Sequence, residues 1–137
     1  MNIADIVKEY LTGLEEQDIE TVAALLTDDA TIEIPLSHTG DLTPWFVFKG
    51  KGDSLGYIGT IFNNFGQVKL LNRAVYVAED GHTVFVETTG DLVQRGTNAS
   101  YRNKYVFKFT ILDGRISHVS EYANPVTFAK LMGIDLG

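Results

Sequence analysis

The stretch that decides the fold is residues 101–123, which read YRNKYVFKFTILDGRISHVSEYA. Asp113-Gly114 in its middle is a strong signal for a two-residue hairpin turn. Before the turn, mostly polar even positions alternate with a second set that contains Tyr101, Asn103, Tyr105, Phe107, Phe109 and Ile111. This alternation is typical of a strand with one buried face. We therefore predict two antiparallel strands, 101–112 and 115–123, whose aromatic face needs a covering layer.

Other strands precede this hairpin in the chain. Residues 68–78 and 83–92 also have strand-like patterns, and Glu79-Asp80-Gly81-His82 between them is a turn sequence. Residues 30–35 alternate as well and form a short strand that ends at a proline. We expect residues 36–51, which include Gly40, Pro44 and Gly50, to be a long irregular connection.

The first half of the chain is mainly helical in pattern. Apolar residues recur at helical spacing at Ile3, Ile6, Val7, Tyr10, Leu11 and Leu14. Asp18 is suited to cap a second helix over residues 19–26, and Asp53 or Ser54 to cap a third that Gly66 ends. A short helix is expected over 126–132. Helices followed by a meander predict an α+β fold.

Composition limits the possible classes. The 137 residues fit one domain, 1–137, and 45% hydrophobic with 21% charged residues is typical of a folded globular protein. The absence of cysteine excludes disulfides, thiolate nucleophiles and cysteine-based metal sites. No apolar run exceeds five residues and the first residues do not resemble a leader, so we expect a cytoplasmic protein with no membrane partner.

The charge is unevenly distributed. The net charge is −7, and residues 1–33 hold nine acidic residues and one basic residue, whereas residues 34–137 hold nine and ten. No basic stripe with interleaved aromatic residues is present, which argues against nucleic acid as a partner. The simplest interpretation of the acidic region is a set of solvated helix faces.

Two stretches carry a resemblance to a known superfamily. The segment from Tyr10 through Asp18-Ile19-Glu20 to Asp28-Asp29-Ala30-Thr31-Ile32-Glu33 resembles the opening of ketosteroid isomerases. The segment from Asp113-Gly114-Arg115-Ile116 through Glu121-Tyr122-Ala123-Asn124-Pro125 resembles the closing hairpin of SnoaL-like and phenazine-biosynthesis A/B-like proteins. The chain thus resembles the nuclear transport factor 2-like superfamily. This resemblance implies a cone-shaped, strongly bent antiparallel sheet wrapped around three helices of the N-terminal half.

The resemblance also identifies matching positions for catalytic residues. Ile34 stands where the isomerases have their aspartate base, so steroid isomerisation by that mechanism is not expected. Tyr10 matches their oxyanion tyrosine, and their second oxyanion residue, an aspartate, falls near Asn103 or Tyr105. Glu121 matches the glutamate general acid that phenazine-biosynthesis A/B-like proteins carry before an Asn-Pro pair.

Glu121 is the main catalytic candidate. It shares a strand face with Ser117, Val119 and Ala123, and the resemblance directs that face into the cone. Burial in an apolar cavity raises the pKa of a carboxyl group and allows it to act as a general acid near neutral pH. The alternatives are a carboxylate that faces solvent or pairs with a lysine or arginine.

Further catalytic candidates are polar side chains that could donate hydrogen bonds to the substrate or transfer a proton. Asn103 and Tyr105 can donate hydrogen bonds to a carbonyl oxygen or an oxyanion, or can simply be satisfied core groups. Tyr10 lies in an apolar stripe, where core packing is the commoner role, and His38 in the long connection is either a proton shuttle or an exposed residue. No metal-ligand cluster and no phosphate-binding loop is present, so we expect no metal and no cofactor.

The apolar candidates suggest a ligand site. Trp45, Phe46 and Phe48 form the densest aromatic run, and they cover either the mouth of the cone or a partner subunit. We expect a cavity of several hundred Å³. Its substrate-binding residues are expected to be Ile34, Trp45, Phe46, Phe62, Phe107, Val119 and Ala123, together with Tyr105.

The expected function is a cofactor-independent enzyme. Its substrate would be a small hydrophobic or cyclic carbonyl-type molecule, and its reaction that of an isomerase, cyclase or dehydratase. The alternatives are a non-catalytic small-molecule binding protein and a dimerisation module with no open cavity. The resemblance also implies a homodimer packed through the outer sheet face, to which we assign Val84 and Val86, or Val106.

Overall fold

The hairpin of residues 101–123 forms the centre of a curled six-stranded sheet. In the computed structural model, which describes all 137 residues, β5 (Ser100–Leu112) pairs antiparallel with β6 (Arg115–Ala123). Asp113 and Gly114 both have positive φ, at 49° and 78°, as a type I′ turn requires. The predicted bounds of these two strands therefore hold to within one residue.

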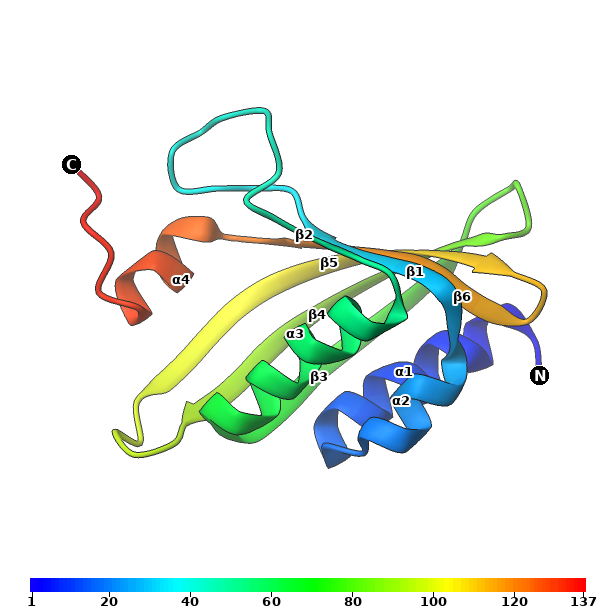
Figure 1. The fold of residues 1–137 in the computed structure, drawn as a ribbon, viewed down its shortest axis with the longest axis horizontal. Helices are drawn as coiled ribbons and strands as arrows, with labels where there is room; N and C mark the ends of the chain where they lie inside the picture. The colour runs from blue at the N-terminus through cyan, green and yellow to red at the C-terminus, as the bar shows by residue number, and fades with distance from the viewer.

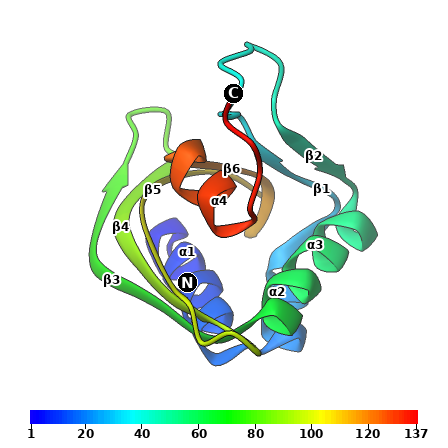
Figure 2. The same cartoon turned by 90° about the vertical axis from the view of Figure 1, so that its left-hand side faces the viewer.

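The remaining strands extend the sheet on both sides, in the order β2-β1-β6-β5-β4-β3. β3 (Phe65–Val77) and β4 (Thr83–Gln94) continue the antiparallel meander. On the other side β1 (Leu26–Ile34) pairs with β6 in parallel, and β2 (Phe46–Lys49) forms the edge. Figure 1 shows the sheet bending around the helices, and Figure 2 looks into its open end. The predicted α+β fold with a strongly bent sheet is confirmed, although one strand pair is parallel.

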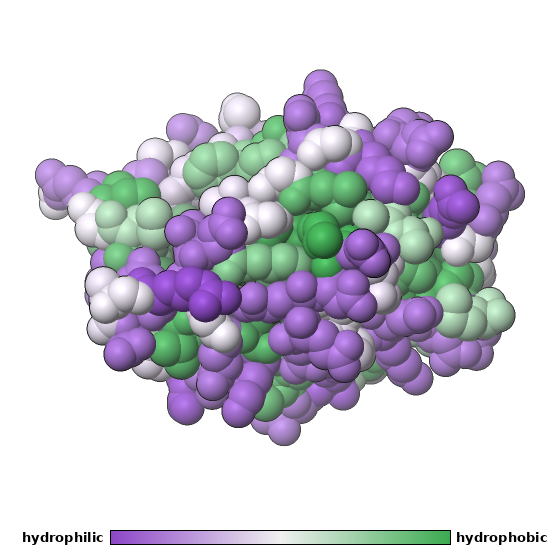
Figure 3. Space-filling view, turned by 60° about the horizontal axis from the view of Figure 1, so that its bottom comes forward, coloured by the Kyte–Doolittle hydropathy of each residue, from purple (hydrophilic) through white to green (hydrophobic).

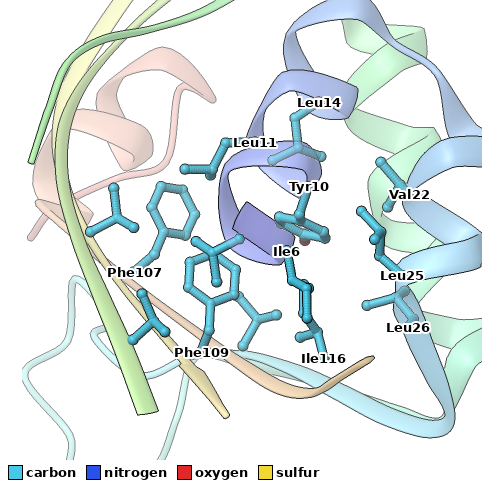
Figure 4. Packing of buried hydrophobic residues seen from close by; sticks show 14 of the residues in the cluster. Ile6, Tyr10, Leu11, Leu14, Val22, Leu25, Leu26, Phe107, Phe109 and Ile116 are labelled. Atoms are coloured by element: carbon cyan, nitrogen blue, oxygen red, sulfur yellow. The ribbon is translucent and has the colours of Figure 1, made fainter. Parts of the chain in front are cut away.

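Four helices accompany the sheet: α1 (Ile3–Glu16), α2 (Ile19–Leu25), α3 (Lys51–Asn64) and α4 (Pro125–Leu131). The predicted apolar stripe of α1 is buried, because Ile6, Tyr10 and Leu11 pack against the concave face of the sheet. Figure 4 shows Tyr10 among these side chains, between the Phe107 and Phe109 side and the α2 side. The narrow end of the cone is therefore filled by a packed core.

The predictions for the long connection and for the start of α3 differ from the structure. α3 begins at Lys51 after Gly50, whose φ is 87°, and not at Asp53 or Ser54. The hydroxyl of Ser54 is instead buried and donates to the carbonyl oxygen of Ala30. The connection that we expected to be irregular contains β2, because residues 46–49 pair with β1.

Two predictions of side-chain direction are wrong. Val84 and Val86 are fully buried and not on the outer face, whereas Val106 is exposed as predicted. Val84 is paired directly with Phe109, and directly opposed residues of an antiparallel pair face the same side. Glu15 is not a solvated helix residue, because it accepts a hydrogen bond from the Leu70 amide and forms an ion pair with Arg73.

The surface is varied in polarity. In Figure 3 hydrophilic side chains cover most of the face seen, with a smaller apolar group near its middle. No helix in the structure combines the length and the apolar character needed to cross a membrane.

Candidate functional site

A cavity of about 790 Å³ opens at the wide end of the cone. Its walls come from the concave side of the sheet, from α3, from residues 45–48 and from α4 with the residues after it. Most of the lining side chains are apolar, and no lysine, arginine or histidine is among them. A charged group in this cavity would therefore have little to solvate or neutralise it.

Glu121 lies on the wall where the packed core gives way to the cavity. Along β6, Val119 is fully buried in the core, Glu121 is 7% exposed, and Ala123 is half-buried and lines the cavity. Burial raises the pKa of Glu121 from an ordinary 4.5 to about 7, and a hydrogen bond from Tyr57 only partly opposes this rise. Both the protonated and the ionised form of this carboxyl group are therefore populated near neutral pH.

Tyr57 on α3 is the hydrogen-bond partner of this carboxyl group. Its hydroxyl donates to Oε2 of Glu121 at 2.7 Å, and its ring stacks on Phe48 with 4.5 Å between the ring centroids. Burial, and next the negative charge of Glu121, raise the pKa of Tyr57 well above its ordinary value, so the hydroxyl stays protonated and donates. Oε1 of Glu121 makes no hydrogen bond within the protein and is left for the contents of the cavity.

Aromatic rings border the cavity in a chain of contacts, which we call the aromatic belt. Successive rings are 4.5 to 6.2 Å apart between centroids, within the range of favourable aromatic contacts. In order of contact, the belt consists of Tyr57, Phe48, Phe46, Trp45, Phe128, Tyr101 and Phe65. Because these residues come from α3, β2 and the residue before it, α4, β5 and β3, the belt joins separate elements around one space.

Tyr105 lines the cavity from β5. Its ring stacks on Phe107 at 5.4 Å and lies close to Gly90 on the neighbouring strand. A Cβ atom at Gly90 would be 2.5 Å from Cε2 of Tyr105, so the glycine leaves the space that this ring occupies. Burial raises the pKa of Tyr105 well above its ordinary value, and the hydroxyl remains a donor.

Of the predicted catalytic residues, only Glu121 and Tyr105 line the cavity. Asn103 is outside its lining: Nδ2 donates to the Tyr101 hydroxyl and the Asn124 carbonyl, and Oδ1 accepts from the Asn124 amide. The amide side chain therefore connects β5 to the start of α4. Tyr10 is fully buried in the core, and its hydroxyl has no hydrogen-bond partner.

His38 is also outside the lining. Its ring lies 5.0 Å from that of Trp45, and its buried Nδ1 has no partner. Among the predicted substrate-binding residues, the cavity is lined by Ile34, Trp45, Phe46, Phe107 and Ala123. Phe62 and Val119 do not line it: Val119 is fully buried in the core, and Phe62 is half-buried and packs against that core.

Tyr57, Tyr101 and Phe128 line the cavity but were not among the predicted site residues. Tyr57 lies off the apolar stripe of α3, and a tyrosine on the flank of a helix gives no sign of a site until that helix is docked. No group of three histidine or acidic side chains is gathered anywhere in the fold. The site thus combines one buried carboxyl group, Glu121, with tyrosine hydroxyls and mostly apolar walls, and the exposed Asp53 also borders it.

The fold is the nuclear transport factor 2-like cone, here with a packed narrow end and an open wide end. The model of the SnoaL-like domain matches residues 7–119, and the chain belongs to this family.

Similar solved structures agree with this assignment. A proposed isomerase from Bacillus subtilis is 23% identical, with a TM-score of 0.81 over 96% of this chain and 92% of that one. A proposed polyketide cyclase from Pseudomonas putida is 20% identical, with a TM-score of 0.80 over 95% and 97%. A phenazine biosynthesis-related protein from Pseudomonas aeruginosa is 20% identical, with a TM-score of 0.76 over 96% and 88%. At these identities the likeness establishes the fold.

Proposed function

We propose that the cavity is the active site of a cofactor-independent enzyme that uses Glu121 as a general acid. The substrate class is a small apolar or cyclic carbonyl compound, and the reaction is of the isomerase, cyclase or dehydratase type. The observation that carries the proposal is a carboxyl group with a pKa of about 7, open to an apolar cavity that contains no basic side chain. The names of the similar structures, a proposed isomerase and a proposed polyketide cyclase among them, support this class of chemistry.

The proton transfer follows from the hydrogen bonds of Glu121. The O–H bond of the acid breaks as an O–H bond forms on the carbonyl oxygen of the substrate. Tyr57 keeps its hydrogen bond to Oε2 and stabilises the carboxylate that remains. That carboxylate can then remove a proton from a neighbouring carbon, which makes the net change an isomerisation without oxidation or reduction. Tyr105 is a second donor for the same oxygen.

The test is turnover by Glu121→Gln with candidate cyclic ketones and enones. Glutamine keeps the shape of the side chain and removes the exchangeable acid proton. We expect kcat to fall by roughly two to four orders of magnitude, with ligand affinity little changed. Unchanged turnover together with an ordinary Glu121 pKa would refute the acid assignment.

A non-catalytic small-molecule binding protein is the second candidate function. The observation in its favour is that the position of the isomerase base is Ile34, which leaves Glu121 as the one buried carboxyl group in the cavity lining. In that case Glu121 and Tyr57 orient a ligand without turnover. Binding of a carbonyl compound that is weakened in Glu121→Gln, with no product formed by the wild type, would favour this function.

A further inference from the structure

The amide side chain of Asn103 is fixed in one orientation by its partners. Oδ1 accepts from the backbone amide of Asn124 at 3.0 Å, and a backbone N–H can only donate. Nδ2 donates to the Asn124 carbonyl oxygen at 3.0 Å and to the Tyr101 hydroxyl at 2.8 Å, which uses both of its protons. Exchanging the amide oxygen and nitrogen would bring donor against donor and acceptor against acceptor at Asn124. The hydroxyl oxygen of Tyr101 is therefore the acceptor in its bond with Asn103.

The proton of the Tyr101 hydroxyl has no acceptor in the protein. A phenol carries one proton, and the hydrogen bond with Asn103 does not use it. Burial raises the pKa of Tyr101, and hydrogen bonds from Asn103 and from Tyr105 oppose this rise, so both act on the Tyr101 oxygen as donors. If Tyr105 donates to the substrate instead, as proposed above, the Tyr101 proton is still unused. A hydroxyl group that accepts hydrogen bonds also donates more strongly.

Tyr101 lies where a molecule in the cavity can reach it. The residue is 5% exposed and lines the cavity, and its ring packs between Phe65 and Phe128, with centroids 6.0 and 5.9 Å away. Phe128 belongs to α4, which lies across the open end of the cone in Figure 2. Glu121 is opposite Phe107, six residues further along β5. The cavity thus has one polar group near its mouth and another near its floor.

We propose that the Tyr101 hydroxyl is a second polar binding site of the cavity, which donates a hydrogen bond to an oxygen of the ligand other than the carbonyl oxygen that meets Glu121. This rests on the proposed function and adds to it a requirement on the substrate: two acceptor oxygens in one molecule. Tyr101 is the binding residue. Asn103 is its positioning residue, because the amide decides in which direction the phenol proton points.

The experiment compares ketones that carry one or two carbonyl groups on the same flexible chain. Nonane-2,8-dione is paired with 2-nonanone and undecane-2,10-dione with 2-undecanone. Affinities are measured by protein NMR titration at about pH 6, where Glu121 is mostly protonated. The ratio of diketone to monoketone affinity should fall roughly threefold to tenfold in Tyr101→Phe for at least one pair, which is the effect of one hydrogen bond.

The ratio separates binding from a structural role of the hydroxyl. If Tyr101 only supports Asn103 and α4, Tyr101→Phe should change the affinities of both ketones by the same factor, and the ratio should stay constant. Tyr76→Phe is the matched control, because it removes a phenol proton from the outer face, where Tyr76 is 52% exposed. This variant should keep the wild-type ratio.

A second variant tests the positioning by Asn103. In Asn103→Asp an oxygen replaces Nδ2, so the new carboxyl group accepts from Tyr101 and turns the phenol proton away from the ligand. The diketone preference should then fall as in Tyr101→Phe, although the hydroxyl group is still present. A folded Asn103→Asp protein with the wild-type ratio would overturn the positioning role. Tyr101→Phe decides the binding site by itself, whether or not Asn103→Asp folds.

Two results would overturn the binding site: no diketone binding by the wild type up to its solubility, or an unchanged ratio in Tyr101→Phe for both pairs. Failure of the site is distinguishable from failure of the proposed function. A reduced ratio in Tyr101→Phe together with an ordinary Glu121 pKa retains the site and removes the acid. A raised Glu121 pKa with an unchanged ratio retains the acid and removes the site.

Discussion

Replacing Tyr57 by phenylalanine removes one hydroxyl group and keeps the ring that stacks on Phe48. The lost hydrogen bond, 2.7 Å between Tyr57 Oη and Glu121 Oε2, stabilises the ionised form of the carboxyl group. A hydrogen bond to a charged group contributes about 1.5–3 kcal/mol, and 1.4 kcal/mol corresponds to about one pKa unit. The pKa of Glu121, already about 7, should therefore rise by roughly one to two units in Tyr57→Phe.

The assay is an NMR titration of protein labelled with ¹³C at the glutamate carboxyl groups. The Glu121 signal is assigned by its absence in Glu121→Gln. Tyr10→Phe serves as a matched control, because Tyr10 is also buried but its hydroxyl has no hydrogen-bond partner. We expect the control to change the pKa of Glu121 much less than Tyr57→Phe does.

An unchanged or lowered Glu121 pKa in Tyr57→Phe would refute the reasoning. It would mean that the Tyr57 hydroxyl does not stabilise the carboxylate. A rise of similar size in both variants would mean that general burial, and not the specific hydrogen bond, controls the acid.

Four further outcomes are expected. The pKa of Glu121 is about 7 in the folded state and about 4.5 in its ordinary, unburied state, so the folded protein binds this proton more tightly than the unfolded chain does. The stability of the wild type relative to Glu121→Gln, measured by urea unfolding, should therefore fall by up to about 3 kcal/mol as pH rises from about 4.5 through about 7. Gly90→Ala should cost about 1–3 kcal/mol by displacing the Tyr105 ring, and the cost should disappear in a Tyr105→Ala background. Asn103→Ala should cost about 2–4 kcal/mol and speed amide exchange in α4, and unchanged exchange would contradict its anchoring role. We expect a homodimer through the outer face that exposes Val106, and light scattering that gives only the 15.1 kDa chain would exclude it.

Where local patterns decide structure, the sequence was sufficient. The Asp113-Gly114 turn and the alternation around it predicted β5 and β6, because a positive-φ turn fixes the register of both strands. The same alternation grouped Glu121 with Val119 and Ala123 on one face, and only the resemblance directed that face into the cone. The apolar stripe of α1 and the Asp18 cap of α2 were predicted for equally local reasons.

Features that depend on pairing between distant segments could not be predicted in this way. Val84 and Val86 were assigned to the wrong side because Phe85 makes the opposite face of β4 apolar too, and only the pairing with β5 decides between them. The depth of a residue along the cone cannot be predicted from alternation either. Val119 and Ala123 share a strand face with Glu121, yet Val119 lies in the core and Ala123 lines the cavity. The partnership of Tyr57 with Glu121 spans 64 residues and has no local signal.

The parallel pairing of β1 with β6 has a consequence for how the chain folds. Ser120 and Glu33, hydrogen-bonded across this pair, are 87 residues apart, and contacts of such long range slow folding. During synthesis, β1 and β2 are complete long before their only other neighbour in the sheet leaves the ribosome, so their unpaired edge needs protection from aggregation. The strand that covers this edge is β6, which also carries Glu121. A chain truncated before β6 would therefore lose its proposed acid and would leave the edge of β1 open to aggregation.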